Sequence, residues 1–255
     1  MNSCAVLLLL TLLSAPATPA QQPQEIPAAP PASIAPPPPS TLGEAIRALP
    51  QSARHLADRP NVIVLGAATA ASLALTSADA QITRTVAASP MDTALDPGDV
   101  IGNGFTQFAV ALGTLAAGQL SHKPSVAETG ADLLDAQIIN GVATQLIKYA
   151  VDRRRPDGGP HSFPSGHASA TFATASVIQR RFGWKAGIPL YALGGYVAAS
   201  RLQENQHYLS DVVFGAALGI VAGRASVHSS KTGVTASLVP LGRGVAVFVV
   251  RRTAR

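Results

Sequence analysis

From residue 41 onward, apolar positions occur in long stretches of Ala, Leu and Val that polar residues interrupt, and no stretch alternates strictly between apolar and polar. This pattern is typical of helices rather than of half-buried strands. It predicts an all-α bundle of about six main helices separated by Pro and Gly breakers. The predicted helices cover roughly residues 61–79, 102–120, 130–151, 166–182, 186–200 and 209–226. The breakers are Pro90, Pro97-Gly98, Pro124, residues 156–160 and Gly183.

The C-terminal tail, residues 231–255, has a different pattern. Two runs rich in β-branched residues flank the sequence Leu241-Gly242-Arg243-Gly244. Such runs on either side of a glycine-containing turn predict a short β-hairpin. The helical domain is therefore expected to cover residues 41–230.

Two segments precede this domain. Residues 1–20 contain an apolar run followed by small residues, which predicts a secretory signal peptide. Its first four residues lack Lys and Arg, so a membrane anchor is the alternative. Residues 21–40 are crowded with proline and predict an extended linker without a core.

Composition excludes several classes of protein. Hydrophobic residues make up 47% of the chain and charged residues 13%, with a net charge of +5. No dense Lys/Arg stripe is present, so we expect no nucleic-acid partner. The single cysteine, Cys4, lies in the predicted signal peptide and excludes a disulfide framework in the mature chain. No cluster of Asp and Glu suggests an ion site, so we expect neither a metal nor another cofactor.

The relation to a membrane is open at the level of sequence. The apolar stretch 212–222 is shorter than the roughly 20 residues that a span requires. The predicted helix 130–151 carries Asp132, Asp135 and Asn140, which favours a water-soluble or peripheral bundle. The distribution of Lys and Arg outside the motifs instead fits six spans with the site outside, so membrane association is the alternative.

The first group of candidate residues lies at the end of the predicted helix 130–151. Lys148 is in its last turn, and Arg155 follows just before a proline that blocks continuation of the helix. Both cations can point into one pocket, although basic residues at a helix end also complement the helix dipole. We expect one or both of Arg153 and Arg154 to be solvent-exposed charges of this second kind.

The second group is Pro164-Ser165-Gly166-His167, at the start of the predicted helix 166–182. Ser165 is suited to the N-cap position. Free N–H groups in the first turn, together with the Ser165 hydroxyl, can hold an anion, and Gly166 permits its close approach. Plain helix capping is the alternative explanation when this motif is taken alone.

The third group is Ser200-Arg201 with His207 and Asp211. Arg201 ends one predicted helix, and the other two residues stand four apart at the start of the next, on one helical face. The carboxylate can accept from one imidazole nitrogen and leave the other free as a nucleophile or base. A simple His–Asp pair at a helix start is the alternative.

Together the three groups resemble the signature of the type 2 phosphatidic acid phosphatase and vanadium haloperoxidase superfamily. The matching residues are Lys148, Arg155-Pro156, Pro164-Ser165-Gly166-His167, Ser200-Arg201, His207 and Asp211. The family is an α-bundle with its site at helix ends, so the resemblance implies the same fold for the whole helical region. Only seven residues, 157–163, separate the first two motifs, which suggests an open site.

The resemblance also implies a catalytic role for three of these residues. His207 is similar to the nucleophile that attacks phosphorus and becomes a phosphohistidine. Asp211 resembles the carboxylate that holds this ring, and His167 the general acid that protonates the leaving oxygen.

Five further residues are implied to bind the phosphate. The cations Lys148, Arg155 and Arg201, with the Ser165 hydroxyl and the Gly166 N–H, would hold the nonbridging oxygens. In this family three fixed cations take the role that a metal has in other phosphatases.

We therefore expect a metal-independent phosphatase of the cell envelope, similar to the exported acid phosphatases of the superfamily, acting on phosphate monoesters. The alternative is a membrane-integral lipid phosphate or lipid pyrophosphate phosphatase. The expected partner is thus a phosphorylated small molecule or lipid, in the periplasm or at the periplasmic face of the inner membrane. A vanadate-dependent haloperoxidase and a non-catalytic phosphate-binding protein are further alternatives, and the oligomeric state stays open.

Overall fold

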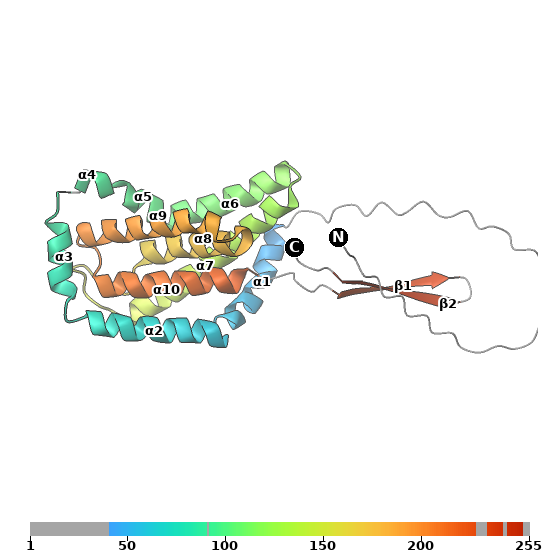
Figure 1. Ribbon diagram of the computed structural model, residues 1–255, viewed down its shortest axis with the longest axis horizontal. Helices are drawn as coiled ribbons and strands as arrows, with labels where there is room; N and C mark the ends of the chain where they lie inside the picture. The colour runs from blue at the N-terminus through green and yellow to red at the C-terminus, as the bar shows by residue number, and fades with distance from the viewer. Residues whose placement is uncertain (1–40, 91, 228–233, 242–243, 252–255) are drawn as a thin grey trace, which may run out of the picture. The chain divides into compact units, whose positions relative to one another are not determined.

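The computed structural model describes residues 41–90, 92–227, 234–241 and 244–251. The predicted signal peptide and proline-rich linker lie outside these residues. The described chain forms ten helices and two strands (Figure 1). The helices are α1 (Leu42–His55), α2 (Arg59–Leu75), α3 (Asp79–Ala87), α4 (Asp92–Leu95), α5 (Pro97–Gly102), α6 (Gly104–Leu120), α7 (Pro124–Val151), α8 (Gly166–Phe182), α9 (Trp184–Gln203) and α10 (Leu209–Ser226). The strands are β1 (Val234–Leu241) and β2 (Gly244–Arg251).

The expected all-α bundle and its six main helices are confirmed, as α2, α6, α7, α8, α9 and α10. The largest difference is the start of α7, which begins at Pro124 rather than at residue 130. Pro124 was expected to separate helices, but it occupies the first turn. Proline is well tolerated there because its missing N–H would have no helical partner in that position.

The sequence pattern did not include α1 among the main helices, although its start carries a recognisable signal. The Thr41 side chain accepts from the Glu44 N–H at 3.2 Å, and the Glu44 carboxylate accepts from the Thr41 N–H at 2.7 Å. This is a capping box, and its spacing of three residues can be seen in the sequence.

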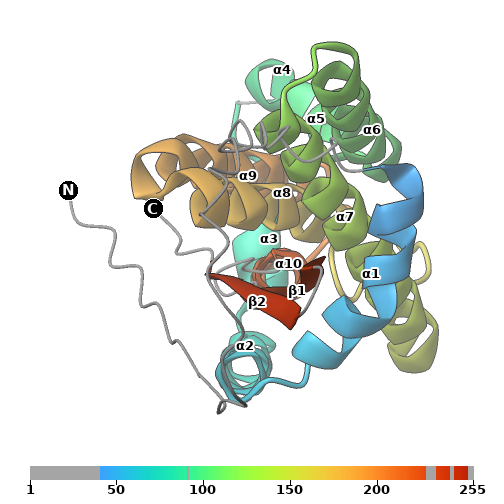
Figure 2. The ribbon, with the colours of Figure 1, turned by 90° about the vertical axis from the view of Figure 1, so that its right-hand side faces the viewer.

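The bundle is arranged around α10. Figure 2 looks along this helix, which packs against α2, α7 and α8. The helix α3 turns by 79° from the direction of α2 and lies across one end of the bundle (Figure 1). This end is where α7 and α9 finish and where α8 and α10 begin, so it is the end that carries all three motifs.

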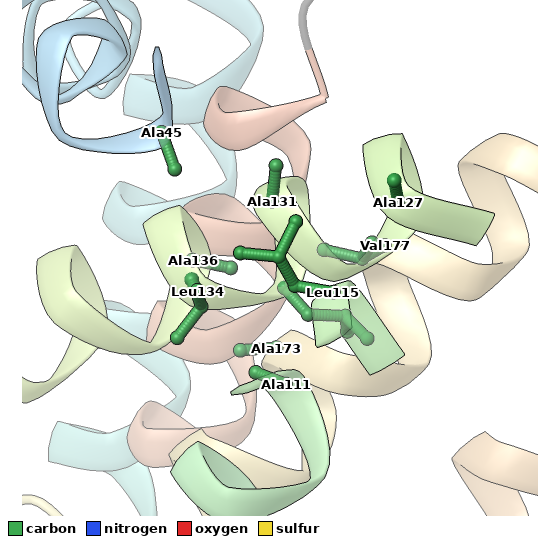
Figure 3. Close-up of a cluster of buried hydrophobic side chains, with 10 residues drawn as sticks. Ala45, Ala111, Leu115, Ala127, Ala131, Leu134, Ala136, Ala173 and Val177 are labelled. Carbon is green, nitrogen blue, oxygen red and sulfur yellow. The ribbon is translucent and has the colours of Figure 1, made fainter. Parts of the chain in front are cut away.

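One part of the core lies between α1, α6, α7 and α8 and consists mostly of alanine (Figure 3). Its larger members, Leu115, Leu134 and Val177, are each at most 3% exposed. Small side chains let neighbouring helices approach closely. Gly130 shows how closely, because a Cβ added there would lie 2.1 Å from the backbone nitrogen of Leu115.

The contact between α8 and α10 depends on three glycines spaced four residues apart. Gly215, Gly219 and Gly223 face the carbonyl oxygens of Ser165, Ser169 and Ala173, in the same order. A Cβ at these glycines would lie 2.6, 2.1 and 2.5 Å from those oxygens. The backbones of α8 and α10 therefore touch along three helical turns, and this contact fixes the second motif against the third.

The outer surface of the bundle carries large apolar side chains. Strongly exposed examples are Phe105, Leu120, Leu146, Tyr149 and Trp184. Among the described helices, α10 is long and apolar enough to cross a membrane, yet 67% of it is buried inside the bundle. The bent pair α2 and α3 passes the same test when the two helices are joined.

At the C-terminal end, the backbones of β1 and β2 pair in an antiparallel manner. The register places Val234 opposite Arg251 and Leu241 opposite Gly244. This is the hairpin that the two β-branched runs predict.

A substitution at Gly219 tests the close packing of α8 on α10. Gly219→Ala would place a Cβ 2.1 Å from the Ser169 carbonyl oxygen, so the helices must separate. We expect the free energy of unfolding to fall by about 1–3 kcal/mol, as for other overpacked cores. Thermal and urea unfolding followed by circular dichroism would measure the change.

Gly195→Ala on α9 is the matched control, because nothing lies within 4 Å of the added Cβ. This control should be neutral or stabilise by up to about 1 kcal/mol, since alanine is the better helix former. Equal stability of Gly219→Ala and the wild type would contradict the tight contact.

Candidate active site

Four helix ends meet around a cavity of about 860 Å³. These are the C-terminal ends of α7 and α9 and the N-terminal ends of α8 and α10. Among the residues predicted from the sequence, the cavity is lined by Lys148, Arg155, Gly166, His167, Arg201 and His207. Ser165 and Asp211 are fully buried next to this lining. The structure thus brings together residues that lie up to 63 positions apart in the sequence.

Lys148 and Arg155 reach the cavity from the end of α7 and the loop that follows it. The Lys148 Nζ donates to the His161 carbonyl oxygen at 2.6 Å. Burial, and then the charge of Arg155, lower the pKa of Lys148 to about 8. The Arg155 Nε donates to the Pro160 carbonyl oxygen at 3.0 Å, and its Nη1 donates to the Gln206 side chain. Both cations are therefore held in place by the loop, and both line one cavity, as the first motif predicts.

Arg201 supplies the third cation from the last turn of α9. Only 3% of it is exposed, and it donates to the carboxylates of Asp99, at 2.7 Å, and Glu204. Asp99 lies on the short helix α5. The residue before it, Gly98, lies so close to Ser200 that an added Cβ would be 2.3 Å from the Ser200 Oγ. This approach places the Asp99 carboxylate beside Arg201.

The N-terminal turn of α8 can bind an anion. Ser165 is the N-cap, as predicted, and its hydroxyl accepts from the Ala168 N–H at 3.4 Å. The first N–H groups of a helix lack intrahelical partners and favour a negative charge. A Cβ at Gly166 would lie 4.0 Å from the Lys148 Cε, so this turn runs directly beside the lysine.

His207 and Asp211 are paired, with 3.6 Å between the imidazole Nδ1 and the carboxylate Oδ2. The expectation that both lie on one face of the helix is wrong in detail, because His207 precedes α10. Tyr208 is the N-cap with extended backbone, and its N–H donates to Asp211 at 2.8 Å. Burial is the main cause that lowers the pKa of His207, and the contact with Asp211 opposes it.

His167 lies in the first turn of α8 and lines the same cavity as His207. Its Nε2 is 3.1 Å from the Asp99 Oδ1. Burial and then the charge of Arg201 lower the pKa of His167 to about 4, whereas Asp99 raises it. The imidazole is therefore neutral at neutral pH, even with Asp99 beside it.

Two parts of this site are not predicted from the sequence. One or both of Arg153 and Arg154 were expected to be solvent-exposed, and Arg154 is exposed whereas Arg153 is not. The Arg153 guanidinium instead binds the carboxylates of Asp79 at 2.8 Å and Asp211 at 2.7 Å. Three consecutive arginines give no sign of which one turns inward. Asp99 was also missed, because it lies in a segment of breakers without any periodic pattern.

The geometry permits one kind of chemistry in particular. Three cations and a helix N-terminus can hold a tetrahedral dianion between two imidazoles. One imidazole has its Nδ1 directed at a carboxylate, which leaves its Nε2 for the cavity. Among the described residues, no group of three or more His, Cys, Asp or Glu is placed to hold a metal ion.

Comparison with known protein families supports the resemblance found in the sequence. The family model of the PAP2 superfamily, the type 2 phosphatidic acid phosphatases, matches residues 157–234. The matched segment contains the second and third motifs, while Lys148 and Arg155 lie just before it. The predicted relationship to this superfamily is therefore confirmed.

Two characterised proteins share part of the sequence. A lipid A 1-phosphatase from Porphyromonas gingivalis is 38% identical over 98 residues, which is 36% of this chain and 21% of the relative. A decaprenylphosphoryl-5-phosphoribose phosphatase from Mycobacterium tuberculosis is 35% identical over 123 residues, which is 44% of this chain and 64% of the relative. The chain thus matches less than two thirds of either protein.

A solved structure shares the fold. It is a transmembrane PAP2-type phosphatidylglycerolphosphate phosphatase from Bacillus subtilis, with a TM-score of 0.51 and 17% sequence identity. The alignment covers 72% of this chain and 92% of that protein. The likeness confirms the helical fold.

The role of Asp99 can be tested by its effect on His167. Asp99→Asn removes the negative charge that raises the pKa of His167 and leaves Arg201 less compensated. Both changes disfavour the imidazolium, so we expect the pKa of His167 to fall further below about 4. An NMR titration of the His167 ring, assigned with a His167→Asn variant, would measure this pKa.

Asp96→Asn is the matched control, because Asp96 is an exposed carboxylate on the same segment whose charge does not act on His167. It should leave the pKa of His167 unchanged. An unchanged or raised pKa in Asp99→Asn would show that Asp99 does not act on this imidazole.

Proposed function

We propose that this chain is a phosphatase that hydrolyses a lipid-linked phosphate monoester through a phosphohistidine, without a metal. One observation carries the proposal: the cavity that holds the three cations and two histidines is also lined by Phe105 and Phe108 of α6. Phe105 is 90% exposed. A site of this kind offers cations to a phosphate and an apolar rim to the group that carries it.

In the proposed reaction the lone pair of the His207 Nε2 attacks phosphorus and forms a P–N bond, while the bond from phosphorus to the leaving oxygen breaks. The electron pair of that bond goes to the leaving oxygen, which takes a proton from His167. Water then attacks phosphorus and gives a proton to His167. The P–N bond breaks, which frees phosphate and His207.

The protonation states of the two histidines are consistent with these roles. Burial lowers the pKa of His207, which keeps the nucleophile neutral before attack. His167 must carry a proton, yet its pKa in the free site is about 4. A bound phosphate dianion raises this pKa because it favours the charged imidazolium. Substrate binding would therefore protonate the general acid.

Lys148, Arg155 and Arg201 would hold the nonbridging oxygens, with the Ser165 hydroxyl and the Gly166 N–H below them. Charge-assisted hydrogen bonds of this type strengthen as charge moves onto phosphoryl oxygens in the transition state. Lys148 and Arg201 are at most 8% exposed, so folding has already removed these cations from water. Phosphate binding therefore requires little further desolvation of the two side chains. The three cations would thereby supply the stabilisation that a metal supplies elsewhere.

Between the two substrate classes predicted from the sequence, we favour the lipid-linked one. The relatives from Porphyromonas gingivalis and Mycobacterium tuberculosis are named for lipid substrates. The apolar rim at Phe105 and the exposed apolar side chains of α6 and α7 fit a substrate that is presented by a membrane. The hypothesis of an acid phosphatase acting on soluble esters stays a prediction that the substrate experiment below decides.

The proposal includes the place of action. Residues 1–20 have the pattern of a signal peptide, and the linker 21–40 would separate the catalytic domain from its point of entry. We infer that the domain works in the periplasm or at the periplasmic face of the inner membrane.

The nucleophile can be tested directly. His207→Ala should lower turnover of p-nitrophenyl phosphate on the order of 10³-fold or more, because the bond-forming atom is gone. Rapid quenching of the wild type should trap a phosphoryl group on His207 that is stable to alkali and labile to acid, detected by mass spectrometry. His122→Asn, in the turn between α6 and α7, is a control that should keep full turnover. Unchanged turnover in His207→Ala would exclude the mechanism.

The substrate class can be tested at the cavity rim. Phe105→Ser should lower the ratio of kcat/KM for phosphatidic acid in detergent micelles to kcat/KM for glycerol phosphate by about tenfold. This corresponds to about 1.4 kcal/mol, slightly less than full burial of a phenylalanine side chain contributes. Leu120→Ser, at the other end of α6 and 83% exposed, is the matched control. A wild type that prefers glycerol phosphate would instead support the acid phosphatase hypothesis.

A further inference from the structure

An ion network lies behind His207, outside the lining of the cavity. Its centre is the Arg153 guanidinium, which donates to the Asp211 Oδ1 at 2.7 Å and to the Asp79 Oδ2 at 2.8 Å. The Arg153 side chain is 25% exposed, while those of Asp79 and Asp211 are 2% and 0% exposed. The same guanidinium lies over the Tyr208 ring, 4.2 Å from its centre. Arg153 thus bridges two buried carboxylates.

The network also holds the start of α10. The Asp79 Oδ1 accepts from the Ser210 N–H at 2.9 Å, and the Ser210 hydroxyl contacts both Asp79 and Arg153. The Asp211 Oδ2 accepts from the Tyr208 N–H at 2.8 Å. The residues directly after His207 are therefore fixed from both sides, by α3 and by the segment that follows α7.

The positive charge of Arg153 compensates two buried carboxylates, those of Asp79 and Asp211, at once. Asp79 and Asp211 both contact Arg153, and water is excluded from both. Burial raises the pKa of Asp211 and the charge of Arg153 is among the contacts that lower it, so loss of this charge would favour a protonated Asp211. A protonated or displaced Asp211 could neither orient the imidazole of His207 nor stabilise its positive charge after phosphoryl transfer.

We propose that Arg153, anchored by Asp79, is a positioning residue that keeps the Asp211 carboxylate and the start of α10 in the geometry that His207 requires for attack. The inference rests on the phosphatase function proposed above. It assigns a purpose to the fifth residue after Lys148, which the three-part motif does not include.

Three substitutions and two controls test the role of Arg153. Arg153→Met removes the charge. Arg153→Lys keeps the charge but lacks the planar guanidinium that donates to both carboxylates, and Asp79→Asn removes only the carboxylate of Asp79. Arg181→Met removes the ion pairs of Arg181 with Asp132 and Glu128, at the opposite end of α8 from His167. Arg154→Gln removes the exposed neighbour.

For p-nitrophenyl phosphate we expect Arg153→Met to lower kcat on the order of 10²-fold with little change in KM, the size of effect seen when reacting groups are misplaced by about 1 Å. Arg153→Lys should recover at least a tenth of wild-type kcat. Asp79→Asn should cause a smaller loss than Arg153→Met. In the double variant with Arg153→Met and Asp79→Asn, the fold-loss of kcat should be smaller than the product of the two single fold-losses, because both residues act through one network.

The pH profile separates a positioning role from a purely structural one. Asp211 faces His207 and the charges of Lys148 and of Arg153, which Asp79 shares, and it accepts from Ser162 and Tyr208. Loss of the Arg153 charge raises the pKa of Asp211, whose ionised form His207 requires, so the acidic limb of kcat/KM should move to higher pH in Arg153→Met. Arg181→Met should melt at a lower temperature and keep the wild-type profile.

The outcomes are distinct. If the folded fraction of Arg153→Met, measured by circular dichroism, has wild-type kcat and pH profile, the positioning role is wrong. It is also wrong if Arg153→Lys performs no better than Arg153→Met while both are folded. A wild type that neither hydrolyses p-nitrophenyl phosphate nor forms a phosphoenzyme would instead overturn the proposed phosphatase function.

Discussion

The burial of one carboxylate organises this end of the molecule. Asp211 is fully buried, so each of its oxygens must be compensated by donors. Its Oδ1 accepts a hydrogen bond from the Arg153 guanidinium, and its Oδ2 accepts from the Ser162 hydroxyl and the Tyr208 N–H. Its backbone carbonyl also accepts from the Ser165 N–H at 3.0 Å. Segments from all three motifs are thereby joined at one residue, and the cavity takes its shape around that junction.

The helices that carry these segments can meet only because their contact faces are small. Gly215 and Gly219 let α10 touch the backbone of α8, and alanines fill most of the core between α6, α7 and α8. Such packing leaves little freedom in the distance between helix axes. The N-cap Ser165 and the first turn of α10 therefore hold a fixed separation, which a site for a tetrahedral anion requires.

The electrostatics of the cavity follow from the same burial. Burial is the main cause that lowers the pKa of both His207 and His167, and the charges of Lys148 and Arg155 at His207 and of Arg201 at His167 lower it further. Both imidazoles are therefore neutral in the free site. In the proposed reaction a bound phosphate dianion would favour the imidazolium of His167, which gives up the proton, while His207 attacks in its neutral form.

The sequence by itself determined the helical bundle, its six main helices and the eight residues that meet at one end of it. Helical periodicity, breakers and motif spacing are local properties, and they could be read without knowing how the helices pack. Only the tertiary structure decided that Arg153 turns inward while Arg154 does not, and that Asp99 stands beside Arg201 and His167. These choices depend on whether α3 or α5 packs against a given charge across more than 60 residues of chain, and no local pattern records that.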